Sequence, residues 1–305
     1  MIRGAIARTY AAAMRARHLG AAAADRFQSR WMPVTHAVKQ TKWQYQDHEE
    51  RLRDEVMPNA ASTEAASILA DLRANGWHVA ENYWDRKTCE LAVAEIERLF
   101  REYPRFVRPN PKSDHRFFGA EALSSRIDQF GHAPVLAEVA TLHNRIPTRL
   151  GMTLAARLTA SGGNLGSGEG WHRDQFFCST KAMLYLTDVG RDNGPFEMLQ
   201  RSFECEDVCR DVRHARLGNM QYRISERQVT RLLEKDAARL KTFCAPAGTL
   251  IVFNASSIHR GKPIASSVRY ALTNYYFTRY WSDEQIAREF APFATARDLT
   301  NAVSA

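Results

Sequence analysis

The stretch GTLIVFNASSIHRGKPI, residues 248–264, joins an apolar run to a turn that contains a histidine. Residues 249–253 have the length and the aliphatic content of a buried β-strand. Similar short runs follow one another through the second half of the chain, mostly separated by Gly, Pro, Asn or Ser, over residues 153–161, 182–189, 196–199, 240–245 and 268–280. A series of short strands divided by turn residues predicts a β-sandwich or barrel for this half of the chain.

The first half of the chain has helical patterns instead. Cap residues and apolar spacing predict helices over about 34–56, 62–72, 85–102 and 133–143, a strand over 77–83, and one helix within the β region, 225–235. The fold class is therefore α+β. We expect a helical, basic N-terminal extension over residues 1–75 and a β-rich domain with flanking helices over residues 76–305.

Composition and charge limit the function. With 305 residues, 45% hydrophobic and 25% charged, the chain is typical of a globular protein. The net charge of +8 is concentrated in residues 1–46, which contain eight basic side chains and one acidic one. The remainder is nearly neutral, so no basic groove for nucleic acid is indicated. Five cysteines are too few and too irregularly placed for a disulfide framework, which favours a reducing compartment such as the cytoplasm.

The N-terminal arm, residues 1–27, is rich in Ala and Arg and leaves three alternatives open. Ile2, Ile6, Tyr10 and Met14 recur every four residues, which suits a helix packed on the main domain. A basic, weakly amphipathic helix also suits peripheral contact with anionic lipid. The same composition suits a mitochondrial transit peptide if the source is eukaryotic.

The candidate site begins at GEGWHRDQF, residues 168–176, where His172 and Asp174 lie two positions apart. On a strand, such residues project to the same face, so both can reach one ion. His259, in the turn after the strand at 249–253, can supply a third ligand. Two histidines and one carboxylate, with the other coordination positions open, form the ligand set of non-haem Fe(II) oxygenases.

Arg269 lies ten residues after His259 and opens the apolar strand RYALTNYYF. A buried, unpaired guanidinium is very costly, so this position calls for an anion. A dicarboxylate cosubstrate meets the requirement, because one end can chelate the metal while the far carboxylate pairs with Arg269 in bidentate fashion.

Four segments together resemble the phytanoyl-CoA dioxygenase family: GSGEGWHRDQF, KAMLYLTDVGRDNGPFEML, GTLIVFNASSIHRGKPI and RYALTNYYF. The likeness runs from about Leu72 to Arg279. It implies a double-stranded β-helix (jelly roll, cupin-like) and an oxidoreductase that uses Fe(II), 2-oxoglutarate and O₂. Residues 199–203, LQRSF, depart from the Pro-Gly-Ser-His that is usual in the family.

The resemblance implies roles for seven residues. His172, Asp174 and His259 would bind iron and carry catalysis, and Arg269 would bind 2-oxoglutarate. Polar contacts with the cosubstrate are expected from Arg157, Thr159 and Thr273. The implied activity is a dioxygenase that hydroxylates an unactivated C–H bond of a small-molecule metabolite, with release of succinate and CO₂. A carboxylate at Asp174 favours oxygen transfer over the chemistry of related halogenases, which carry a small residue there.

Other interpretations remain at this point. The same ligands suit zinc in a hydrolase, or a cupin-like isomerase, and a non-catalytic jelly-roll scaffold is a third alternative. Arg173, Lys262 and Arg279 are candidate contacts for an anionic substrate, and the glycines at 162–170 suit a flap that closes over the site. His48, Glu49 and Glu50, which also spell HxE, are expected on a solvated helix face. The sequence does not select a substrate.

Overall fold

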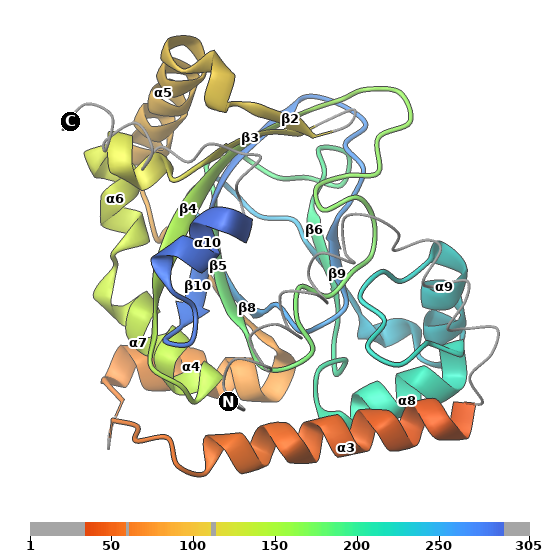
Figure 1. Ribbon diagram of the computed structural model, residues 1–305. Coiled ribbons are helices and arrows are strands. Elements are labelled where there is room, and N and C mark those ends of the chain that lie inside the picture. The colour runs from red at the N-terminus through yellow and green to blue at the C-terminus, as the bar shows by residue number, and fades with distance from the viewer. Residues whose placement is uncertain (1–33, 59–60, 111–113, 290–305) are drawn as a thin grey trace.

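The computed structural model describes residues 34–58, 61–110 and 114–289 (Figure 1). The N-terminal arm lies outside the described residues. The structure therefore tests none of the three alternatives for it: a helix packed on the main domain, lipid contact or a transit peptide. Among the described helices, none is both long enough and apolar enough to span a membrane.

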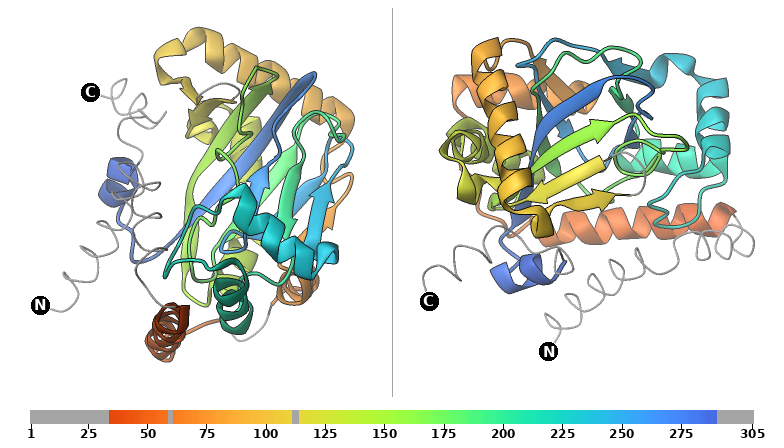
Figure 2. Two further views of the ribbon diagram at one scale, coloured as in Figure 1. Left: turned by 90° about the vertical axis from the view of Figure 1, so that its right-hand side faces the viewer. Right: turned by 90° about the horizontal axis from the view of Figure 1, so that it is seen from above.

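Seven strands form one large antiparallel sheet, and three form a smaller one (Figures 1 and 2). In spatial order the large sheet contains β1 (Trp77–Ala80), β8 (Leu250–Asn254), β5 (Thr180–Tyr185), β10 (Val268–Thr278), β4 (Thr148–Thr159), β3 (Asp114–Phe118) and β2 (Arg108–Asn110). The small sheet contains β7 (Leu240–Phe243), β6 (Phe196–Leu199) and β9 (His259–Gly261). Every pairing is antiparallel.

The two sheets face each other across an apolar core. One buried cluster combines Met183, Tyr185, Ile251, Phe253 and Ala271 of the large sheet with Phe196, Met198 and Phe243 of the small one. The face of the large sheet that carries these residues is called the inner face below. Because side chains alternate along a strand, Arg269, Thr273 and Tyr275 of β10 also belong to the inner face.

Helices cover the outer face of the large sheet. They are α4 (Thr63–Asn75), α5 (Arg86–Glu102), α6 (Ser125–Gly131) and α7 (Pro134–Asn144). Their buried residues, such as Leu72, Ile96 and Val139, share a cluster with Leu184 and Leu272 of the sheet. Short 3-10 turns lie at Pro104–Phe106, Ala120–Leu123 and Ala237–Arg239.

The small sheet is flanked by α8 (Cys205–Ala215) and α9 (Glu226–Lys235), and α3 (Val34–Leu52) packs against α8 (Figure 1). A last helix, α10, spans Asp283–Glu289. Side-chain hydrogen bonds place the N-caps of α4, α5 and α9 at Ser62, Asp85 and Ser225, at the starts of the ranges predicted for these three helices. The expectation of a single helix inside the β region was wrong, because α8 precedes α9. The division at residue 75 stays a prediction.

Candidate metal centre

The backbone brings His172 and His259 side by side. The amide of His172 donates to the carbonyl of His259 at 2.9 Å, and the amide of His259 returns a bond of 2.9 Å. Such a reciprocal pair between antiparallel segments places the two side chains on the same face. The amide of Asp174 donates to Ala255 O at 3.0 Å, which ties the third residue to the segment that leads into His259. Two stretches about 85 residues apart in the sequence therefore converge as predicted.

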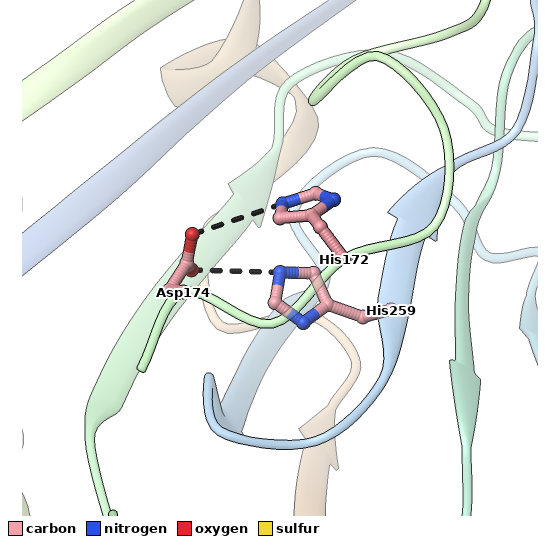
Figure 3. Close-up of side chains that lie close together, drawn as sticks. All are labelled: His172, Asp174 and His259. Carbon is pink, nitrogen blue, oxygen red and sulfur yellow. Dashed lines mark ion pairs between the residues drawn. The ribbon is translucent and has the colours of Figure 1, made fainter. Parts of the chain in front are cut away.

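Hydrogen bonds fix the orientation of both imidazole rings. Nδ1 of His172 lies 2.8 Å from Gly170 O, and Nδ1 of His259 lies 2.8 Å from Ser257 O. A carbonyl only accepts, so each Nδ1 carries the proton and each Nε2 keeps a free lone pair. Both Nε2 atoms face Asp174, at 3.7 Å from Oδ1 for His172 and 3.5 Å from Oδ2 for His259 (Figure 3).

His172, Asp174 and His259, called the triad below, form a donor set suited to a metal ion. One ligand atom from each lies within 4.8 Å of the others. Carbonyl groups that receive the Nδ1–H of ligand histidines are a usual feature of protein metal sites, because they orient the ring and raise its basicity. Two imidazole nitrogens and one carboxylate oxygen suit Fe(II) with open coordination positions.

Burial and neighbouring charges keep His172 and Asp174 in the protonation state that a metal requires. Burial, and then the neighbouring His259, hold the pKa of His172 well below its ordinary value, so the ring is neutral. Burial by itself raises the pKa of Asp174, but the Lys181 ammonium and His259 lower that pKa further, so the group is a carboxylate. His172 and Asp174 are therefore ready to act as ligands near neutral pH.

Lys181 is a member of the site that the sequence analysis missed. Its Nζ lies 2.7 Å from Asp174 Oδ2 and 3.8 Å from the centre of the Tyr275 ring. It stands at the start of β5 on the inner face, two positions from Met183. The signal was present in KAMLY, where a single cation begins an otherwise apolar strand.

Arg269 lies on the inner face as predicted and is 3% exposed. Its Nη1 donates to Gly194 O, and its buried Nε has no hydrogen-bond partner within the described part of the chain. Among the described residues no carboxylate lies within ion-pair distance of Arg269, and burial lowers its pKa. A buried guanidinium with an unused N–H fits the carboxylate of a bound ligand. Thr273 is half-buried on the same face.

The expectations for Arg157 and Thr159 were wrong. Arg157 points to the outer face, where its Nη1 donates to both carboxylate oxygens of Glu97 on α5, at 2.9 and 3.0 Å. Thr159 lies two residues further along β4, so it shares that face. The inner face of β4 carries Ala156 and Leu158, which pair with Ala271 and Arg269. The strand that lies beside Arg269 was predicted correctly. The residues expected to face the cosubstrate were Arg157 and Thr159, but the side chains on that face are those of Ala156 and Leu158.

The three candidate contacts for an anionic substrate have other partners. Arg173 is fully buried and donates to the carbonyls of Ser202 and Ser256. Arg279 pairs with Glu55, with 2.9 Å between Nη2 and Oε1. The Lys262 ammonium lies 3.2 Å from Arg191 O.

Part of the glycine-rich stretch is packed, not open. Gly168 has φ +83°, and a Cβ at this position would overlap the ring of His172. A Cβ at Gly166 would overlap the backbone of Gly261 in β9. Gly170 also has positive φ, at +87°, but nothing lies within 4 Å of a Cβ there. The glycines therefore let the loop press against a triad residue, which the flap interpretation did not anticipate.

Residues 72–270 match the family model described as phytanoyl-CoA dioxygenase (PhyH). The chain belongs to this family. The match covers most of the chain, contains all three triad residues and Arg269, and confirms the resemblance found in the sequence. None of the curated proteins is significantly similar in sequence to this PhyH-family chain.

Solved structures support the same fold. HygX from Streptomyces hygroscopicus, solved with iron bound, is 14% identical over 73% of this chain and 89% of its own, with a TM-score of 0.50. SnoK, a non-haem alpha ketoglutarate dependent carbocyclase from nogalamycin biosynthesis, is 14% identical over 72% and 87%, with a TM-score of 0.51. The epimerase SnoN, in complex with Fe³⁺, alpha ketoglutarate and nogalamycin RO, is 15% identical over 70% and 83%, with a TM-score of 0.50. The predicted jelly-roll fold of this PhyH-family protein is confirmed.

Proposed function

We propose that the protein is an Fe(II)- and 2-oxoglutarate-dependent dioxygenase that hydroxylates a C–H bond of a small-molecule metabolite. One observation carries the proposal. The triad converges within 4.8 Å, and the buried cation Arg269 lies on the inner face with an N–H that none of the described residues accepts. Membership of the PhyH family supports the same cofactor and cosubstrate.

Each residue has a defined task in this proposal. The Nε2 atoms of His172 and His259 and one oxygen of Asp174 hold the ion from one side and leave its other side open to ligands. Arg269 would receive the far carboxylate of 2-oxoglutarate. Thr273, half-buried on the same face, is placed to add a polar contact. The bound iron, with 2-oxoglutarate and O₂, supplies the oxidising power for C–H hydroxylation.

The two alternatives from the sequence have less support. A zinc hydrolase or isomerase with the same ligands gives Arg269 no cosubstrate to bind. A non-catalytic scaffold has no need for two imidazoles whose tautomers are fixed toward one carboxylate. Two proteins of similar fold are an epimerase and a carbocyclase, so hydroxylation must be tested separately from the use of iron and 2-oxoglutarate.

The test begins with anaerobic reconstitution. We expect Fe(II) and 2-oxoglutarate together to produce a visible charge-transfer band, and oxygen to produce succinate. Asp174→Ala removes the anionic ligand and should abolish both signals while the circular dichroism spectrum stays that of the wild type. The proposal fails if the wild-type protein gives neither band nor succinate.

A second experiment separates the reaction outcomes. Candidate metabolites are first screened by the succinate that they elicit, and any hit is then turned over under ¹⁸O₂. Hydroxylation places one ¹⁸O atom in the product, whereas epimerisation or ring closure leaves the product without it. If succinate forms but the product carries no ¹⁸O, the use of iron and 2-oxoglutarate stands and hydroxylation is rejected.

A further inference from the structure

Helix α3 contacts the segment that directly follows the metal ligand Asp174. The hydroxyl of Tyr45 lies 3.0 Å from Phe176 O and 2.8 Å from Phe203 O, within donating distance of both carbonyls. The ring of His48 stacks on Phe177, with 4.1 Å between centroids and 10° between planes. His48 was expected on a solvated face, but this stacking covers it. Two consecutive residues after the HxD segment therefore rest on α3.

The second segment that Tyr45 contacts also supports the other ligands. Arg173, between His172 and Asp174, donates to the carbonyl of Ser202, the residue before Phe203. The Ser202 hydroxyl accepts a hydrogen bond from the amide of Ile258 at 2.9 Å. Ile258 directly precedes His259. Residues 202–203 thus link the segment carrying two ligands to the segment carrying the third.

This link coincides with the departure from the family pattern at residues 199–203. The Ser202 hydroxyl also donates to Leu199 O at 2.6 Å, which closes the turn after β6. The Tyr45 hydroxyl of α3 adds a hydrogen bond to Phe203 O, next to this turn. Burial raises the pKa of Tyr45 far above its ordinary value, so its hydroxyl remains a hydrogen-bond donor.

We propose that α3 is part of the metal centre and that Tyr45 is a positioning residue for the triad. The inference depends on the triad binding a metal, as proposed above. Residues 34–52 lie outside the family match, which begins at residue 72, so this support comes from outside the matched region. A ligand set functions only when its supporting residues hold it within about 0.5 Å of the productive geometry. By hydrogen bonding to both loops, Tyr45 fixes the position of Phe176 relative to Phe203.

The simpler explanation is that α3 only adds stability by packing on α8. The two explanations differ in what they predict for metal binding. Loss of a residue that supports metal ligands typically weakens metal affinity by about 10- to 100-fold. Loss of a residue that only stabilises the fold lowers the melting temperature and leaves the affinity of the folded protein unchanged.

The decisive variant is Tyr45→Phe, which keeps the ring and removes the hydroxyl. The full-length protein is titrated with Co(II) against a chelator, and the visible d–d spectrum of the Co(II) form is recorded. We expect about 10-fold weaker binding and a changed spectrum, because the ligands relax. We expect His48→Ala, which removes the stacking on Phe177, to weaken Co(II) binding as well.

Ser62→Ala is the matched control. Ser62 caps α4 and also donates to Glu138, away from the triad, so its loss lowers the melting temperature without touching the network. We expect this variant to bind Co(II) like the wild type. If Tyr45→Phe lowers the melting temperature but binds Co(II) within twofold of the wild type and with the same spectrum, the inference is wrong.

The outcome is separable from the proposed function. If the wild type binds Co(II) and Tyr45→Phe weakens that binding, the inference holds even when no succinate is ever formed. If succinate is formed and Tyr45→Phe binds metal normally, the proposed function holds and the role of α3 is rejected.

Discussion

Lys181 and Asp174 form an ion pair beside the metal centre, with 2.7 Å between Nζ and Oδ2. The lysine ammonium also lies over the Tyr275 ring, which holds the charge in place by a cation–π contact. Asp174 therefore has two kinds of partner, a fixed cation on β5 and the two imidazoles that face it. A divalent ion bound by the triad has to share this carboxylate with Lys181.

The first prediction concerns that competition. Lys181→Met removes a positive charge within a few ångströms of the metal position and frees Asp174 Oδ2. Relief of the repulsion is worth about 1.4 kcal/mol or more at a partly buried site, so Co(II) or Fe(II) should bind at least about tenfold more tightly. Chelator competition measures this, with Lys241→Met on the exposed edge of β7 as the control. Weaker binding by Lys181→Met would mean that orientation of Asp174 outweighs repulsion.

The second prediction concerns Arg269. Arg269→Ala removes the partner of the cosubstrate carboxylate, and truncating one member of a buried charge pair costs about 2 kcal/mol or more. The 2-oxoglutarate concentration for half-maximal charge-transfer absorbance should rise by about 30-fold or more. Arg157→Ala is the control, because Arg157 pairs with Glu97 on the outer face and its loss should leave that concentration unchanged. If both substitutions raise the required 2-oxoglutarate concentration equally, the cosubstrate carboxylate is not bound by Arg269.

The third prediction concerns the glycine loop. Gly168→Ala adds a Cβ that overlaps the His172 ring, so the ring must move and metal affinity should fall by about tenfold or more. Gly170→Ala carries a similar backbone penalty, since both glycines have positive φ, but its Cβ meets open space. Comparing the two by Co(II) titration separates backbone strain from displacement of the ligand. Equal affinities would show that the loop moves aside without disturbing His172.

The fourth prediction concerns acid stability. Burial lowers the pKa of His48 from its ordinary 6.5 to about 4. The unfolded chain therefore takes up a proton on this residue at a higher pH than the folded one. His48 contributes stability that is fully present above about pH 6.5 and is lost as the pH falls toward 4. His48→Phe keeps an aromatic ring on Phe177 but cannot titrate.

The measurement is urea unfolding at pH 7 and pH 5. The wild type should lose more unfolding free energy between the two conditions than His48→Phe does. The same loss in both proteins would show that His48 is protonated equally easily in the folded and unfolded states.

The sequence was most informative where one local pattern had one structural meaning. The starts of α4 and α5 were found because a side-chain oxygen before a helix satisfies nearby amides without help from distant residues. The helix α8, Cys205–Ala215, lies between strands of the β region and was missed. Arg157 and Lys181 show the limit for strands, since alternation gives two faces but does not say which one faces the metal.

By itself the sequence determined the kinds of residue at the site, namely two histidines, a carboxylate and an arginine ten residues later, and the succession of strands able to carry them. These follow from short-range spacing, which the chain contains in full. The tertiary structure decided which neighbours complete the site. Lys181, Tyr45 and Ser202 reach the metal ligands only because β5, α3 and the turn after β6 pack beside them, and the side-chain contacts that result connect residues distant in the chain.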